Sequence, residues 1–439
     1  MRDLVLILFF FSTIPYIFMY PYVGILVWSW IGYMNPHRLA YGFAYSFQFA
    51  LVSAIVTFLS VGLSSRIKKK FPITPVTIFL IIFVCWMLIT TLFALEPVLA
   101  KEELSRALKI QAVIFLTLIL LDSKKKIDHL IWVIVFSIGF YGVKGGTFAI
   151  LTGGSHRVWG PDDSFISGNN EIALALVMIV PLMVYIITEL TRYISKIEKK
   201  FIFKLIRLGV IGTLILCIIA ILATYSRGGF LSLAICIFLL VMRSKKKILL
   251  LIVMATAIGI GYNFLPEKWF DRMDTMTEEK EDLSMQGRYN AWWFATHVAL
   301  ARPITGGGFR VFTDRQYAKY YPIDYTRDAH SIYFEVLGEQ GFVGLFFYLM
   351  LNFLGFMTGF KIKKLIGKRE DMAWARVLSS MIQISLISFA FGGLFKGMAY
   401  WDLPYHIIAI LVLMRVQIET KLKDELEQRK TTGTTLTSG

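Results

Sequence analysis

Long runs of apolar residues alternate with short polar segments along almost the whole chain. Many of these runs approach about 20 residues, the length that a helix needs to cross the hydrocarbon core of a bilayer. They are too long and too continuous for strands, which would alternate apolar and polar positions. The pattern therefore predicts an all-α fold, a polytopic transmembrane helical bundle.

Short clusters of Lys and Arg separate the apolar runs, and the positive-inside rule places such clusters in the cytoplasm. They lie at 66–70, 124–126, 192–204, 243–247, 361–369 and after 421. If all clusters share one side, an even number of crossings separates each from the next. The runs that satisfy this condition are 73–94, 105–121, 127–151, 170–190, 205–224, 229–242, 248–265, a run after 331 that ends near 360, 374–396 and 401–416.

The region before Arg66 sets the number of passes. Taken as one kinked pass over 3–33 and one pass over 42–63, it gives about twelve helices with both termini inside. Pro15 and Pro21 interrupt the first run and leave a thirteenth pass open. The expected domains are transmembrane helices with short loops over 1–265, one large outer loop over 266–330, C-terminal transmembrane helices over 331–418 and a disordered cytoplasmic tail over 419–439.

Composition agrees with a membrane protein. Hydrophobic residues make up 56% of the chain and charged residues 17%, which is outside the usual range of soluble domains. A net charge of +16 could suggest a nucleic-acid partner, but here the cations lie in short loops, as membrane topology requires. We therefore expect no nucleic acid. Cys85, Cys217 and Cys236 all lie in apolar spans and imply neither a disulfide nor a metal site.

Three polar segments face the same side in this topology, away from the cytoplasm. They are the loop at 153–171, the turn at 225–229 and the large loop at 266–330. Chemistry at this face would depend on the polar side chains that these segments carry. The candidates are Arg157, Asn169, Arg227, Arg288, Tyr289, Arg310 and His330, with Glu335 on the helix that follows.

Arg227 is the most informative candidate. It stands at the outer end of an apolar span, where the positive-inside bias disfavours arginine, so a cation there is costly unless an anion accompanies it. Arginine binds phosphate oxygens bidentately, and the adjacent Gly228 and Gly229 would let a ligand approach the backbone. The competing interpretation is an arginine that extends to the membrane interface. Arg157, Arg288 and Arg310 could each face a ligand or solvent.

His330 follows Asp328 and begins an apolar helix. Histidine suits proton transfer near neutral pH because its ordinary pKa is about 6.5. An exposed histidine at a helix start would have no such role, and the sequence alone does not exclude it.

No metal or other cofactor is expected. The pair Asp162-Asp163 lies in a turn, where such residues are common. The run Gly306-Gly307-Gly308 lacks the Lys-Ser/Thr of a phosphate-binding P-loop. Outside the cytoplasm there is no supply of nucleotide sugars, so an enzyme at this face needs a donor that is already activated. A glycan on a polyprenyl pyrophosphate fits, since its leaving group would call for arginines at the membrane boundary.

An ordered set of motifs resembles the O-antigen ligase and polymerase superfamily. It consists of Ser226-Arg227-Gly228-Gly229, Gly287-Arg288 with Trp292-Trp293, Gly306-Gly307-Gly308, Ala329-His330-Ser331 and Gly338-Glu339-Gln340-Gly341. The segments 33–38, 139–146, 157–161 and 269–273 are similar to the O-glycosylation ligases that accompany exosortase A systems. Together these segments extend over most of the chain up to about residue 345.

The resemblance implies a GT-C-like, metal-independent glycosyltransferase in the bacterial inner membrane, with its active face in the periplasm. It would transfer a glycan from undecaprenyl pyrophosphate, with inversion, to lipid A core, a protein or another glycan. By motif, Arg227 and Arg288 would hold the pyrophosphate, and His330 would act on the acceptor hydroxyl. The remaining substrate-binding candidates are Arg157, Arg310, Asn169, Tyr289 and Glu335.

Other functions remain open at this point. A polymerase of the same superfamily would use another lipid-linked unit as its acceptor. A transporter or flippase is a second possibility, although the motifs lie on one face and no internal repeat is visible. A scaffold for envelope assembly would leave Arg227 unexplained.

Overall fold

The computed structural model describes residues 2–64, 70–197, 200–244, 247–248, 283–323 and 326–435, and within these ranges the chain is helical without strands. Eight helices are long and apolar enough to cross a membrane, and two shorter helices are also apolar. This confirms a polytopic helical membrane protein. The ten are α1 (Arg2–Met19), α2 (Tyr22–Met34), α4 (Phe49–Leu63), α5 (Pro75–Leu92), α7 (Lys124–Leu151), α8 (Asn169–Ile194), α9 (Phe201–Ala223), α15 (Ile332–Ile366), α16 (Ala373–Gly392) and α17 (Asp402–Thr435).

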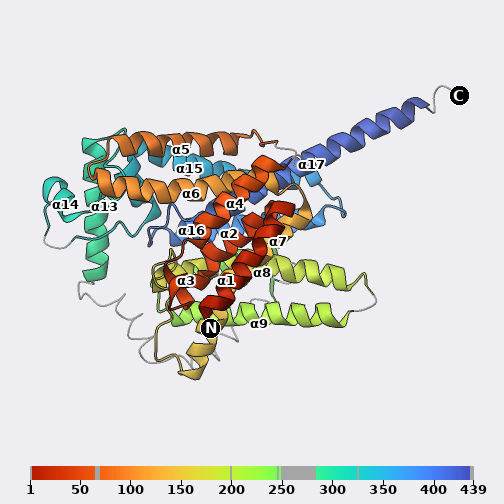
Figure 1. Ribbon diagram of the computed structural model, residues 1–439, viewed down its shortest axis with the longest axis horizontal. Helices are drawn as coiled ribbons and strands as arrows, with labels where there is room; N and C mark the ends of the chain where they lie inside the picture. Colours follow the sequence, from red (N-terminus) through yellow and green to blue (C-terminus); the bar gives the residue numbers. More distant parts are fainter. Residues whose placement is uncertain are drawn as a thin grey trace.

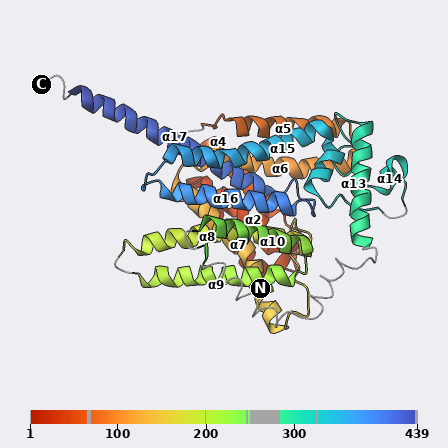
Figure 2. The same cartoon turned by 180° about the vertical axis from the view of Figure 1, so that it is seen from behind.

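The remaining helices complete the bundle and cover one end of it. They are the 3₁₀ helix η1 (Pro36–Leu39), α3 (Phe43–Ser46), α6 (Pro97–Leu120), α10 (Arg227–Arg243), α13 (Leu283–Ala301) and α14 (Asp314–Tyr320). Figures 1 and 2 show α13 lying across the end of the long helices, with α14 beyond it. The expected large loop is therefore helical in its described part, and the expected pass at 248–265 lies outside the described residues except for residue 248.

The basic clusters meet at one end, which we call the basic end. Lys124 Nζ lies 3.3 Å from Glu189 and 5.3 Å from the ring centre of Trp374. Arg243 and Lys363 both donate to the Gln383 side-chain oxygen, at 3.4 Å and 2.7 Å. Four clusters that are far apart in sequence thus share one end, as the positive-inside pattern predicts. Which side of the membrane this end faces stays a prediction.

The opposite end, called the loop end, gathers the outer turns. The amide of Val158 donates to Ala223 O at 3.0 Å, and the amide of Leu95 donates to Gly307 O at 2.8 Å. The amide of Ile332 donates to Gly393 O at 2.8 Å. These contacts tie the loop at 153–171 to the end of α9 and the large loop to the ends of α5 and α16. Arg227, Arg288 and Asn169 also line one cavity, so the polar segments share this end.

The N-terminal region forms two helices, which agrees with the thirteenth pass that the prolines left open and differs from a single kinked pass. The rings of Phe9 and Trp30 lie 5.1 Å apart, so α1 and α2 fold back on one another as a hairpin. The break falls beside Pro21, because a proline disfavours helical geometry in the residue before it. Asp3 accepts hydrogen bonds from the amides of Gly42 and Ala44, both at 3.3 Å. The N-terminus therefore lies at the loop end, and the expectation that both termini share the cytoplasmic end is wrong.

The C-terminal tail was also predicted incorrectly. We expected disorder from residue 419, but α17 continues as a helix to Thr435 and extends beyond the bundle (Figure 1). Arg369 lies 2.6 Å from Glu425, and Lys421 lies 2.9 Å from Asp371. These ion pairs hold the helix to the turn before α16. The tail is charged, but its charges are spaced for helix formation, with opposite signs four residues apart.

The helix α8 occupies the centre of the bundle, and most of its side chains are buried. On one side of it, α7 packs on α9 with almost no side chain between them. A Cβ atom on Gly142 would lie 2.1 Å from Cys217 Sγ, and one on Gly146 would lie 2.3 Å from Leu216 O. Small residues allow this close approach of membrane helices. Cys217 is therefore a packing residue, as its apolar context predicts.

Candidate functional site

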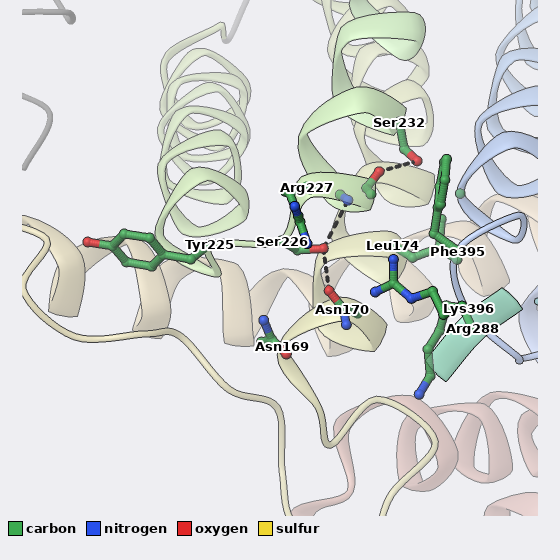
Figure 3. Close-up of a pocket in the computed structure, with 13 residues that line it drawn as sticks. Asn169, Asn170, Leu174, Tyr225, Ser226, Arg227, Ser232, Arg288, Phe395 and Lys396 are labelled. Carbon is green, nitrogen blue, oxygen red and sulfur yellow. Dashed lines mark hydrogen bonds between the residues drawn. The ribbon is translucent and has the colours of Figure 1, made fainter. Parts of the chain in front are cut away.

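A small cavity of about 80 Å³ lies at the loop end and brings together cations from three segments. Arg227 comes from the start of α10, Arg288 from α13 and Lys396 from the loop after α16 (Figure 3). Asn169 and Asn170 line it from the start of α8. Arg227, Arg288 and Asn169 were all predicted as site residues, and here they line one cavity.

The first turn of α10 contributes its backbone as well as its arginine. Ser226 caps the helix: its hydroxyl accepts a hydrogen bond from the Gly229 amide at 3.0 Å and donates to Asn170 Oδ1 at 2.6 Å. A helix N-terminus carries partial positive charge and favours bound anions. Tyr225 points away from the cavity, and its hydroxyl donates to Gly154 O (Figure 3). The Ser-Arg-Gly-Gly turn thus directs charge, not aromatic surface, at the cavity.

The two glycines of this turn are explained by packing. A Cβ atom on Gly229 would lie 2.6 Å from Cβ of Ala173, and one on Gly228 would lie 3.0 Å from Cβ of Phe395. Glycine therefore lets α10 approach α8 and the loop after α16. We had attributed these glycines to close approach of a ligand, whereas in the structure protein atoms occupy the space.

Lys396 was not among the predicted site residues. Its Nζ lies 2.5 Å from Oε1 of Glu171, and the two side chains are 17% and 16% exposed. The signal was present in the sequence, because Lys396 stands at the outer end of an outgoing span, as Arg227 does. The argument from positive-inside bias would have selected it too.

The charge of the small cavity favours an anion. Arg227, Arg288 and Lys396 all line it, no acid does among the residues that the structure describes, and Glu171 pairs with Lys396 at its edge. Guanidinium groups bind phosphate oxygens bidentately, and a low-dielectric site strengthens each contact. The cavity is large enough for a phosphate-sized group and too small for a glycan. It is suited to hold the charged part of a larger substrate.

His330 lies beside this cluster of cations, just before α15. Burial, together with the positive charges of Lys396, Arg288 and Arg327, lowers the pKa of His330 from 6.5 to about 4. The imidazole is therefore neutral near pH 7 and can accept a proton. Its backbone has φ 44°, in the left-handed region that non-glycine residues rarely adopt. Such strained positions concentrate at functional sites.

The segment around His330 is held by α13 and α14. Trp292 donates from Nε1 to Ala329 O at 3.0 Å and stacks on Phe334 with 4.9 Å between ring centres. Tyr317 donates from its hydroxyl to Arg327 O at 2.6 Å. These contacts fix the backbone on either side of the histidine. The Trp292 of the motif is thus a positioning residue.

The two glycine motifs form one joint. The amides of Gly307 and Gly308 donate to Gly338 O and Glu339 O, both at 2.8 Å. A Cβ atom on Gly306 would lie 2.5 Å from the Gly341 nitrogen, and Gly341 itself has φ 71° inside α15. The run of three glycines is therefore a backbone contact with a kinked helix, which agrees with its lack of P-loop residues.

On the first turns of α15, Glu339 is buried and Glu335 is half-buried. Glu335 accepts a hydrogen bond from the Ala399 amide at 3.0 Å, and Glu339 accepts one from the Arg310 amide at 2.8 Å. Neither lines the small cavity. Glu335 anchors the loop that carries Lys396, and its role in substrate binding stays a prediction.

The other three predicted residues lie elsewhere. Arg310 lines a second, larger cavity of about 850 Å³. Arg157 is exposed on the loop after α7, and Tyr289 is 52% exposed on α13. Neither lines the small or the large cavity. Sequence position could place these residues at the loop end but could not show which way they point.

Within the described ranges, no group of three His, Cys, Asp or Glu side chains is placed to hold a metal ion. The aspartate pair that might suggest one has a different role. Asp163 lies 3.3 Å from Arg38 and accepts a hydrogen bond from the Tyr45 hydroxyl at 3.0 Å. It therefore ties the loop after α7 to the N-terminal helices.

Two family models match separate parts of the chain. Residues 212–349 match a family model described as O-antigen ligase, and this region contains Arg227, Arg288 and His330. Residues 1–191 match a model described as a family of unknown function. No curated protein matches the sequence. The similarity to exosortase-associated ligases stays a prediction.

Proposed function

Since this chain belongs to the O-antigen ligase superfamily and is a multi-pass membrane protein, we propose that it is a glycosyltransferase that moves a glycan from undecaprenyl pyrophosphate to an acceptor hydroxyl in the periplasm. A glycan-ligating or polymerising role follows from the family. The observation that carries the finer proposal is the convergence of Arg227, Arg288 and Lys396 on one small cavity beside a neutral His330.

In the proposed reaction, the donor pyrophosphate occupies the small cavity. The acceptor oxygen attacks the anomeric carbon from the face opposite the pyrophosphate, so the configuration inverts. The bond between the anomeric carbon and the phosphate oxygen breaks, and undecaprenyl pyrophosphate leaves. His330 takes the acceptor proton and later releases it to solvent. No metal or nucleotide is required, because the donor is already activated.

The cations would stabilise charge as it develops on the leaving group. Electrostatic stabilisation by preorganised groups typically contributes about 10²–10³ in rate for one contact. A positioned general base typically contributes about 10²–10⁴. Lys396 would act partly through Glu171, which fixes its ammonium group at the cavity wall.

The test is transfer in vitro. The protein in lipid nanodiscs would receive undecaprenyl-pyrophosphate glycan and candidate acceptors in EDTA. We expect transfer by wild type, a loss of about 10²–10⁴ in His330→Ala and a loss of about 10²–10³ in Arg227→Ala. Arg315→Ala, an exposed arginine on α14 that lines neither cavity, is the matched control and should keep full activity.

Two outcomes would change the conclusion. A ladder of products from lipid-linked glycan alone would identify a polymerase of the same superfamily. Movement of labelled donor across the bilayer without transfer to any acceptor would overturn the glycosyltransferase and favour a transporter.

A further inference from the structure

The larger cavity opens at the loop end between α2, α4 and α6, and it combines a charged mouth with an apolar wall. At about 850 Å³ it is roughly ten times the size of the cavity that holds Arg227. Its mouth is formed by the turn after α2, the loop after α7 and the segment after the glycine joint. The charged residues that line it are Arg38, Arg106, Lys109, Asp163, Arg310 and Asp402.

Positive charge is in excess at this mouth. Arg38 lies 3.3 Å from Asp163, and Arg106 lies 3.5 Å from Glu103. Lys109 and Arg310 also line the cavity, and neither makes an ion pair or a side-chain hydrogen bond within the part of the chain that the structure describes. Two cations without protein partners, beside one apolar opening, fit an anionic group that comes from outside the protein.

The apolar wall follows one face of α4. Its residues recur at the spacing of a single helix face, and they extend over about 12 Å of helix at 1.5 Å per residue. They are Ala50, Leu51, Ala54, Ile55 and Phe58. The facing wall of α6 includes Ala112, whose small side chain leaves room for a hydrocarbon chain, whereas Gly32 on α2 lies beside the carboxylate of Asp402. The groove thus runs from the cations at its mouth toward the middle of the bundle.

The groove lies where two hydrophobic clusters meet. The N-terminal helices have their own cluster, built around Phe10, Ile31 and Phe49. The central bundle forms a separate, much larger cluster. An apolar ligand of matching shape would make dispersion contacts with both walls and would so join the two parts.

We propose that this groove binds one anionic phospholipid of the surrounding membrane leaflet. Its phosphate would lie at Lys109 and Arg310, and one acyl chain would lie along α4. The site is independent of glycan transfer. Most of its lining belongs to residues 1–191, the region matched to a family of unknown function, with Arg310 and Asp402 as the exceptions. The lipid would therefore assign a binding role to that region.

The test is lipid retention measured by native mass spectrometry. The protein would be equilibrated with equal amounts of phosphatidylglycerol and phosphatidylcholine. We expect wild type to retain one phosphatidylglycerol. Each cation near a membrane surface contributes about fivefold in affinity for an anionic lipid, so Lys109→Ala combined with Arg310→Ala should weaken retention about 25-fold. Ala54→Trp fills the groove and should also release the lipid.

Matched variants test whether the lipid is held at this groove. Lys101→Ala removes an exposed cation of α6 that does not line the cavity, and Arg227→Ala removes a cation of the small cavity. Both should keep the lipid. Equal retention of the two phospholipids by wild type would overturn the proposal, and so would a loss in Arg227→Ala as large as in the double variant. Neither readout depends on transfer activity.

Discussion

The two cavities at the loop end differ in how they are built. The difference favours a role in glycan transfer for the small cavity and a role in lipid binding for the large one. The small cavity lies where turns converge, and its charged side chains come from α10, α13 and the loop after α16. The large cavity lies between helices, with cations at its mouth and an apolar wall along α4. The first is suited to a reacting anion and the second to a lipid that stays in place.

Removing one arginine from each cavity tests whether the two cavities have separate roles. Arg288→Ala should lower the transfer rate by about 10²–10³, because it removes a contact to the leaving group. Arg310→Ala should leave the transfer rate unchanged, because the groove that it lines is independent of glycan transfer. Transfer in nanodiscs measures both. Equal losses would mean that the two cavities act as one site.

The ion pair at the wall of the small cavity should matter for stability. Lys396→Met leaves Glu171 with a largely buried charge and should destabilise the protein by about 3 kcal/mol. Adding Glu171→Gln removes that charge and should restore a large part of the lost free energy of unfolding. Unfolding by denaturant in detergent micelles measures both variants. A double variant no more stable than Lys396→Met would show that Glu171 has another partner.

One loop connects the two cavities and offers a way to disturb both at once. The Gly160 amide donates to Ser167 O at 2.9 Å, and a Cβ atom on Gly160 would lie 1.6 Å from Ile166 O. The same loop leads from Asp163 at the large cavity to Asn169 at the small one. Gly160→Ala should therefore cost about 1–3 kcal/mol and reduce both transfer and lipid retention.

The control for this variant is Gly209→Ala on α9, where an added Cβ atom would meet nothing within 4 Å. It should affect neither readout. If Gly160→Ala impaired transfer but left lipid retention at the wild-type level, the loop would serve only the small cavity.

The smallest expected effect is a shift in pH dependence. As a base, His330 must be neutral, so transfer should be flat above its pKa of about 4 and should fall as pH drops through that value. Lys396 is one of the charges that lower this pKa. Lys396→Met should therefore move the acid limb of the rate profile to higher pH. A limb that stays in place would show that another group limits the rate.

The helical bundle could be predicted because its signal is local. Apolar run length and basic clusters define the helices and bring the clusters to one end, and the structure agrees for α5 to α10. The N-terminal hairpin was left open as a thirteenth pass, because a helix break at Pro21 has the same sequence pattern as a kink. The helical tail was missed because composition alone does not reveal the partner of Glu425, which is Arg369 in a distant turn.

The site was predicted in part, for a related reason. Motif and topology identified Arg227, Arg288 and His330 and placed them at one face. They could not show whether a residue lines a cavity or anchors a loop, as Glu335 does through the Ala399 amide. That distinction depends on the facing loop, where the Ala399 amide lies, and no local pattern encodes it.

The glycine joint has a consequence for how members of such a family can diverge. Its hydrogen bonds, together with one from the Phe342 amide to Pro303 O at 3.0 Å, close residues 303–342 into a ring of fixed circumference that contains His330. Chain added or removed ahead of α13 enters upstream of this ring. Relatives could therefore gain or lose residues there without moving the histidine. A single residue inserted inside the ring would displace it.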